Sequence, residues 1–181
     1  MKKAKKHAKK HSKKGFSLIE LLIVVAIILI IAAIAIPNLL RSRIAANEAS
    51  AVASVRTLNT AEITYSTTYP INFNGDTGGF AQLTQLGGTC SITVAPTSST
   101  ACLIDTALAN ATANNQLKSG FYFAVNLPAV GDYVIGAAPG SKGTTGIRSF
   151  CSQPDGVVRQ KQDGDTAPVT DDAGCAAYIP L

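Results

Sequence analysis

The chain lacks the side chains that many enzymes use. It has no Trp, and its two histidines, His7 and His11, both precede Gly15. The part after Gly15 therefore offers no Ser–His–Asp or Cys–His catalysis and no histidine-based metal site. A phosphate-binding G-x-x-x-x-G-K-[ST] motif is also missing, and the cysteines are spaced neither for C-x-x-C redox chemistry nor for zinc. These absences argue against an enzyme, and we expect no catalytic residue and no bound cofactor.

Positive charge is concentrated in the N-terminal tail. The formal net charge is +5, but eight lysines precede Gly15, and the rest of the chain carries eight Lys and Arg against eleven Asp and Glu, a net charge of −3. A basic chain is a candidate for binding nucleic acid. Because the excess here lies in a tail, we expect no nucleic-acid function of the part that follows.

A long stretch almost without charge follows the tail. Phe16–Ile36 comprises 21 residues with one ionisable side chain, Glu20. A helix of this length can cross a bilayer, with the lysines on the cytoplasmic side. The run is too long for an ordinary secretory signal peptide, and no A-x-A cleavage site follows it. A charge inside hydrocarbon costs about 2.5–3.5 kcal/mol unless it is paired, so Glu20 is a candidate functional residue. A single-pass anchor with Glu20 near an interface would show the same pattern.

The string GFSLIELLIVVAIILIIAAIAIPNL, which begins at Gly15, resembles the N-terminal signature of type IV pilins and of the related pseudopilins of type II secretion. The resemblance implies that a prepilin peptidase and methyltransferase cuts the Gly15–Phe16 bond and N-methylates Phe16. It also implies that Glu20 pairs with the Phe16 amine of a neighbouring subunit. Pro37 would bend the helix in the free subunit and loosen it in the fibre, although a plain kink without an assembly role is an alternative.

The helical pattern continues beyond the apolar run. Residues 38–69 contain many alanines, no glycine and no internal proline. Pro70 disfavours a helical residue before it, so we predict that the helix ends near Thr67–Tyr69. Glu48 and Glu62 interrupt the apolar stripe, and we expect them at its edge. The stripe follows steps of three, four or seven residues: Leu40, Ile44, Ala51, Val55, Leu58, Tyr65 and Tyr69.

The remaining chain predicts a sheet after a long connection. Residues 70–119 are rich in Gly, Thr, Asn and Ser, with short helices expected within Phe80–Leu86 and Leu103–Ala113. Alternating apolar residues and turn signals then predict four strands: Phe121–Leu127, Asp132–Ala137, Ile147–Cys151 and Val157–Lys161. Their short connections predict an antiparallel meander with one face on the helix. The predicted class is α+β, and the resemblance implies the same pilin fold, with one long N-terminal helix packed by a sheet of about four strands.

The predicted organisation therefore has five segments. They are a cleaved leader (1–15), a membrane-spanning or filament-core helix half (16–37), an amphipathic helix half (38–69), a connecting αβ-loop (70–119), and an antiparallel sheet with a disulfide-bounded C-terminal region (120–181).

Four cysteines lie downstream of the apolar run: Cys90, Cys102, Cys151 and Cys175. An even number on the exported side predicts two disulfides. Four cysteines allow three pairings, and we favour Cys90–Cys102 with Cys151–Cys175 because both close locally. The second pairing would resemble the disulfide-bounded C-terminal region of many pilins.

An acidic stretch that we expect to be irregular runs from Asp163 to Cys175. Asp163, Asp165, Asp171 and Asp172 are candidate ligands for calcium, which prefers several oxygen ligands on a flexible loop, and some pseudopilins of the resembled family carry such a site. The spacing lacks the regular alternation and the terminal Glu of an EF-hand. A solvated acidic loop is therefore the favoured interpretation.

The resemblance implies a structural protein. The chain would be a single-pass precursor in the cytoplasmic membrane, and after cleavage an assembly platform in that membrane would build many copies into an extracellular homo-oligomeric filament for adhesion, motility or DNA uptake. A pseudopilin of a type II secretion system is one alternative. A membrane-anchored extracytoplasmic ligand-binding domain is an alternative of another class.

Overall fold

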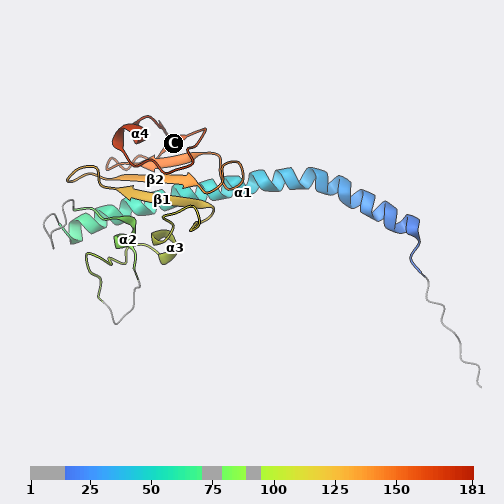
Figure 1. The fold of residues 1–181 in the computed structure, drawn as a ribbon, viewed down its shortest axis with the longest axis horizontal. Coiled ribbons are helices and arrows are strands. Elements are labelled where there is room, and N and C mark those ends of the chain that lie inside the picture. The colour runs from blue at the N-terminus through green and yellow to red at the C-terminus, as the bar shows by residue number, and fades with distance from the viewer. Residues whose placement is uncertain (1–14, 71–78, 89–94) are drawn as a thin grey trace, which may run out of the picture. The chain divides into compact units, whose positions relative to one another are not determined.

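The computed structural model describes residues 15–70, 79–88 and 95–181 (Figure 1). The chain divides into two compact units, Met1–Leu39 and Leu40–Leu181. The first unit contains the apolar part of one long helix. The second contains the rest of that helix together with the described strands and shorter helices.

Helix α1 spans Leu18–Thr68. Its sequence is rich in Ala, Leu and Ile, and Pro37 is its one proline. Among the residues that the structure describes, α1 is the one helix long and apolar enough to cross a membrane. It ends inside the predicted range, because Pro70 disfavours a helical conformation at the residue before it.

A five-stranded antiparallel sheet fills much of the second unit. Neighbouring strands follow the order of the chain: β1 (Phe121–Asn126), β2 (Val134–Pro139), β3 (Ser149–Ser152), β4 (Arg159–Lys161) and β5 (Ile179–Pro180). β1 pairs with β2 along its whole length, from Phe121 opposite Pro139 to Asn126 opposite Val134. The predicted α+β class and meander are confirmed. The predicted strand number missed β5, because two residues that include a proline give neither an alternating pattern nor a full set of ladder donors.

Side-chain hydrogen bonds explain why two strands begin later than predicted. β3 begins at Ser149 and not at Ile147, since the N–H groups of Ile147 and Arg148 donate to Glu48 Oε1 at 2.9 and 3.0 Å. β4 begins at Arg159 and not at Val157, since the Val157 N–H donates to Asp155 Oδ1 at 3.0 Å. In both places a carboxylate takes a donor that the sheet ladder would otherwise use.

Three short helices lie outside α1 in the described residues: α2 (Leu83–Leu86), α3 (Thr106–Ala109) and α4 (Asp172–Ala176). α2 and α3 fall within the two ranges predicted for short helices. α4 corrects the expectation that Asp163 to Cys175 is irregular throughout. The Asp171 side chain caps α4 by accepting the Gly174 N–H at 2.7 Å.

The core of the second unit lies between α1 and the sheet (Figure 1). Tyr65, Leu58 and Val55 of α1 are fully buried, and burying each contributes about 1.5–3 kcal/mol. The helix and sheet residues in this core include Ala51, Val55, Leu58, Ala61, Tyr65, Phe121, Phe123, Ile135 and Phe150. Leu40, which the predicted stripe includes, is 42% exposed, so the buried stripe begins at Ile44.

The solvent-facing side of α1 in this unit carries several threonines. Four of its threonines donate their hydroxyl groups to the carbonyl four residues earlier. These bonds measure 2.8–3.1 Å and run from Thr57 to Ala53, Thr60 to Arg56, Thr64 to Thr60 and Thr68 to Thr64. The hydroxyl groups of this face are therefore bonded within the helix itself.

Candidate functional site: the processing and assembly segment

The predicted processing site lies before the first turn of α1. Gly15, Phe16 and Ser17 are outside the helix, and Phe16 is 79% exposed. A Cβ atom placed on Gly15 would meet no atom of the described residues within 4 Å. The Gly15–Phe16 bond is thus an exposed bond in a non-helical segment, which a protease can bind in an extended form. Residues 1–14 of the predicted leader lie outside the described residues.

Glu20 sits in the first turn of α1, where its carboxylate reaches back along the chain. Its Oε2 atom accepts the Ser17 N–H at 2.9 Å, and the Leu21 N–H donates to the Ser17 carbonyl at 3.2 Å. This is one half of a capping box, in which an acidic residue satisfies a free N–H at the start of a helix. The bonded donor is therefore one residue beyond Phe16, and the pairing of Glu20 with the amine of a neighbouring Phe16 stays a prediction.

The apolar side chains that follow Glu20 are not covered by the chain itself. Exposed fractions of the large ones run from 46% at Val25 to 66% at Ile34 and Ile36. Soluble proteins rarely leave a contiguous apolar surface of this size open to water. This half of α1 therefore needs an apolar surrounding, either lipid or other protein.

Pro37 lies inside α1, and the helix continues through it. A proline in a helix lacks the N–H that would bond to the carbonyl four residues earlier, here Ala33. The boundary between the two compact units falls close behind it, between Leu39 and Leu40. Bending of the free subunit at Pro37 stays a prediction.

The head, by which we mean the sheet and the loops and short helices around it, contacts the second half of α1 through a half-buried ion pair. The sequence did not predict this pair. Glu48 is 5% exposed, and its Oε2 atom accepts from Nε of Arg148 at 2.8 Å and from Nη2 at 2.7 Å. Oε1 accepts the N–H groups of Ile147 and Arg148, and Nη1 of Arg148 donates to Gln160 at 2.7 Å. Burial would raise the pKa of Glu48, but these hydrogen bonds and the guanidinium charge lower it overall. The placement of Glu48 at the edge of the stripe was wrong.

Glu62 is a buried carboxyl group of a different kind. It is 0% exposed, its Oε2 accepts the Ala81 N–H at 2.9 Å, and its Oε1 has no hydrogen-bond partner among the residues that the structure describes. Burial raises the pKa of Glu62 to about 8, so the group is largely neutral at pH 7. Its placement at the edge of the stripe was also wrong. The contact fastens the segment before α2 to α1.

The C-terminal region is held by the disulfide that the sequence favoured. Cys151 and Cys175 are bonded, and with Val134 and Tyr178 they form a second buried cluster. The chain passes so close to β2 that a Cβ atom on Gly136 would lie 2.2 Å from the Val169 carbonyl oxygen. Position 136 therefore accepts only glycine, which was not recognised from the sequence. Cys102 is also in a disulfide, and its predicted partner Cys90 lies outside the described residues.

The four candidate calcium ligands each have a separate partner. Asp163 pairs with Lys142, Asp165 with Lys161 and with the Tyr178 hydroxyl, Asp171 caps α4, and Asp172 accepts from Gln153. No three His, Cys, Asp or Glu side chains within the described ranges are grouped to hold a metal ion. The arrangement is that of an acidic surface with local hydrogen bonds.

Comparison with known proteins finds a family match over the segment that contains Gly15, Phe16 and Glu20. Residues 10–36 match a family model described as the prokaryotic N-terminal methylation motif. The chain thus carries a prokaryotic N-terminal methylation motif. It is 48% identical over 73 residues to the type IV wide pilus major component PilA4 of Thermus thermophilus. That match covers 40% of this chain and 53% of the relative, so the chain spans about half the length of the curated relative that it matches. No solved structure matches the chain.

Proposed function

We propose that the protein is a structural subunit of a type IV pilus-like filament and that its working part is the methylation-motif helix. The proposal rests on the difference in how the two halves of that helix are covered. Its N-terminal half bears the motif and leaves its apolar side chains uncovered, while the second half of α1 is packed under a folded head. A subunit of this kind can bury its free half only against lipid or against other copies.

The proposed sequence of events begins in the cytoplasmic membrane. The lysine-rich tail holds the precursor with its N-terminus in the cytoplasm. A prepilin peptidase cuts the exposed Gly15–Phe16 bond, and the new Phe16 amine is methylated. An assembly platform then moves the helix from lipid into the filament, so that helix–helix contacts replace lipid contacts.

During assembly, Glu20 sets the axial position of one subunit against the next. An unpaired carboxylate in an apolar core is costly, and cleavage creates an amine that can pair with it. Within one chain the carboxylate is already directed to the Ser17 N–H. Pairing with the Phe16 amine of a neighbouring copy therefore fixes the axial position of one subunit against the next.

The test is to shear filaments from cells that produce the protein and to determine the subunit's N-terminus by mass spectrometry. The proposal requires filaments built from a chain that begins with N-methylated Phe16. A mature protein that keeps residues 1–15 would contradict it. Filaments confined to a secretion machine and absent from the cell surface would favour the pseudopilin alternative, whereas the similarity to a pilus major component favours a pilus.

A further inference from the structure

The charged residues of the second unit are divided unevenly between ion pairs and free positions. Five of its eight Lys and Arg residues form ion pairs with carboxylates: Lys118, Lys142, Arg148, Arg159 and Lys161. The other three, Arg41, Arg43 and Arg56, are exposed on α1 and form no ion pair with any described residue. The cations of the sheet and its loops are thus all neutralised within the unit, one of them by Glu48 of α1, whereas the arginines of α1 are not paired with any described residue.

Free carboxylates lie elsewhere in the same unit. Asp132 in the β1–β2 turn and Asp171 and Asp172 at the start of α4 have no cationic partner among the described residues. Partial burial and the neighbouring carboxyl group of Asp172 raise the pKa of Asp132. Like charges are therefore held close together here, and a cation at this place would relieve their repulsion.

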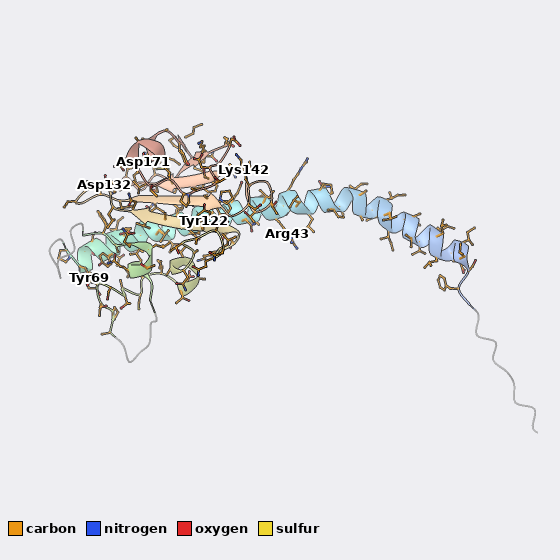
Figure 2. The ribbon with its side chains drawn as sticks, viewed as in Figure 1. Arg43, Tyr69, Tyr122, Asp132, Lys142 and Asp171 are labelled. Atoms are coloured by element: carbon orange, nitrogen blue, oxygen red, sulfur yellow. A yellow bond between two sulfur atoms is a disulfide. The ribbon has the colours of Figure 1, made fainter. Side chains whose placement is uncertain are left out.

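Arg41 and Arg43 cannot reach these carboxylates within one chain. The hydroxyl group of Tyr133, which follows Asp132, lies 3.3 Å from Asn59 Oδ1, so this turn is level with Asn59 along α1. Sixteen residues of helix separate Arg43 from Asn59, a distance of about 24 Å at 1.5 Å per residue. Figure 2 shows Asp132 and Asp171 at one end of the second unit and Arg43 at the other.

We infer that Arg41 and Arg43 of one copy bind the carboxylates of Asp132, Asp171 and Asp172 of a second copy, so that successive heads meet end to end. Opposite charges at the two ends of one compact unit favour a head-to-tail contact over a two-fold one. A head-to-tail contact that does not close into a ring produces an open filament. This contact lies outside the methylation-motif half of α1 and would fix the spacing of the heads.

Single exposed ion pairs are weak and are screened by salt. Here the contact recurs at every subunit, and each arginine faces a group of carboxylates. The inference rests on the proposed function, because it requires that copies assemble. It is separable from it, because filaments could also form through the apolar helix halves with the heads placed differently.

The first experiment is charge reversal in full-length protein, with the amount of sheared surface filament as the measurement. Arg41→Glu with Arg43→Glu should reduce filament yield about tenfold, because two attractive contacts become repulsive. Adding Asp132→Lys and Asp172→Lys to that variant should restore most of the yield. The matched control is Arg56→Glu, which makes the same change on the same helix about one turn from Asn59, away from the Arg41–Arg43 end, and should leave the yield near that of the unchanged protein.

The second experiment locates the contact directly. Arg43→Lys places an amine that a carbodiimide can join to a carboxylate in intact filaments. A covalent link between subunits, mapped from position 43 to Asp132, Asp171 or Asp172, is the expected product, and Arg56→Lys should give none. The pairs Lys118–Asp105 and Lys161–Asp165, at 2.7 and 2.6 Å, provide links within one subunit that show the reagent has worked.

The outcomes distinguish the end-to-end contact from the proposed function. Filaments of the unchanged protein whose yield is insensitive to charge reversal and which give no link from position 43 would overturn the end-to-end contact and leave the proposed function standing. If the unchanged protein forms no filament at all, both are wrong.

Discussion

The two halves of α1 belong to one helix but differ in what covers them. From Leu18 to Leu39 none of the large apolar side chains is buried, whereas ten residues between Ile44 and Tyr65 are buried. The charges differ in the same way. Glu48 in the second half has a guanidinium partner in its own chain, whereas the partner of Glu20 within the described residues is the backbone N–H of Ser17. The apolar side chains of the second half are covered within one molecule, whereas those of the first half need lipid or other protein around them.

The largest expected effect is on Glu20. Glu20→Ala should leave membrane insertion intact and reduce filament assembly about a hundredfold, because the amine of the neighbouring Phe16 would lose a partner worth about 2.5–3.5 kcal/mol in an apolar core. Membrane fractionation and the yield of sheared filaments measure the two steps separately. Glu20→Gln keeps an oxygen acceptor for the Ser17 N–H but removes the charge. Normal filaments from Glu20→Gln would show that the cap matters and the charge does not.

Substitution of Glu48, in the second half of α1, should change the stability of the fold and not the axial position of subunits in a filament. Glu48→Ala should lower the free energy of unfolding by about 3–5 kcal/mol, because Arg148 and two backbone N–H groups would be left without their acceptor. Denaturant unfolding of the full chain in detergent measures this. Asp155→Ala is the control, since it removes the exposed partner of Arg159 and should cost about 1 kcal/mol or less. Equal losses for the two variants would refute the special role of Glu48.

The C-terminal disulfide should have an effect of similar size. Replacing Cys151 and Cys175 together by alanine opens a loop closed over a sequence separation of 24 residues. The expected loss is about 3 kcal/mol, which the same unfolding measurement in the oxidised and reduced states would detect. A variant as stable as the unchanged protein would show that the packing around Gly136 and Val169 holds this region without the bond.

Glu62 should make the stability of the head depend on pH. Its pKa is about 8 in the folded protein and near 4.5 in the unfolded chain, so its contribution is fully present below about pH 4.5 and is lost as the pH rises to about 8. The greatest slope is about 1.4 kcal/mol per pH unit. Glu62→Gln should abolish this slope when denaturant midpoints are compared between pH 5 and 9. Parallel pH profiles for both proteins would contradict the expectation.

Much of this fold could be read from the sequence because the signals are local. The apolar run, Pro70 and the alternation in β1 each act through neighbouring residues, and they predicted the helix end and the strand closely. Glu48 was misplaced because its partner, Arg148, lies 100 residues away along the chain. Helical periodicity shows that a charge interrupts an apolar stripe, but it does not show whether a distant cation meets it.

The short C-terminal elements were missed for another reason. α4 has five residues and includes Gly174, and β5 has two and includes Pro180, so neither is long enough for a periodic pattern. α4 contains Cys175 of the disulfide, and β5 is placed by its pairing with β4, so both depend on residues distant along the chain. In the assembly segment the sequence indicated Gly15, Phe16, Glu20 and Pro37 by resemblance. The capping bond from Ser17 to Glu20 depends on where the helix starts, which the sequence placed at Phe16 and the structure places at Leu18.

The threonines on the outer side of α1 have a consequence for how that side meets other surfaces. Their hydroxyl groups already donate to carbonyls of the same helix. Expelling water from this side therefore leaves none of these four donors unsatisfied, and their methyl groups are what an approaching surface would touch. These threonines, although polar by composition, thus add little to the cost of dehydrating this side.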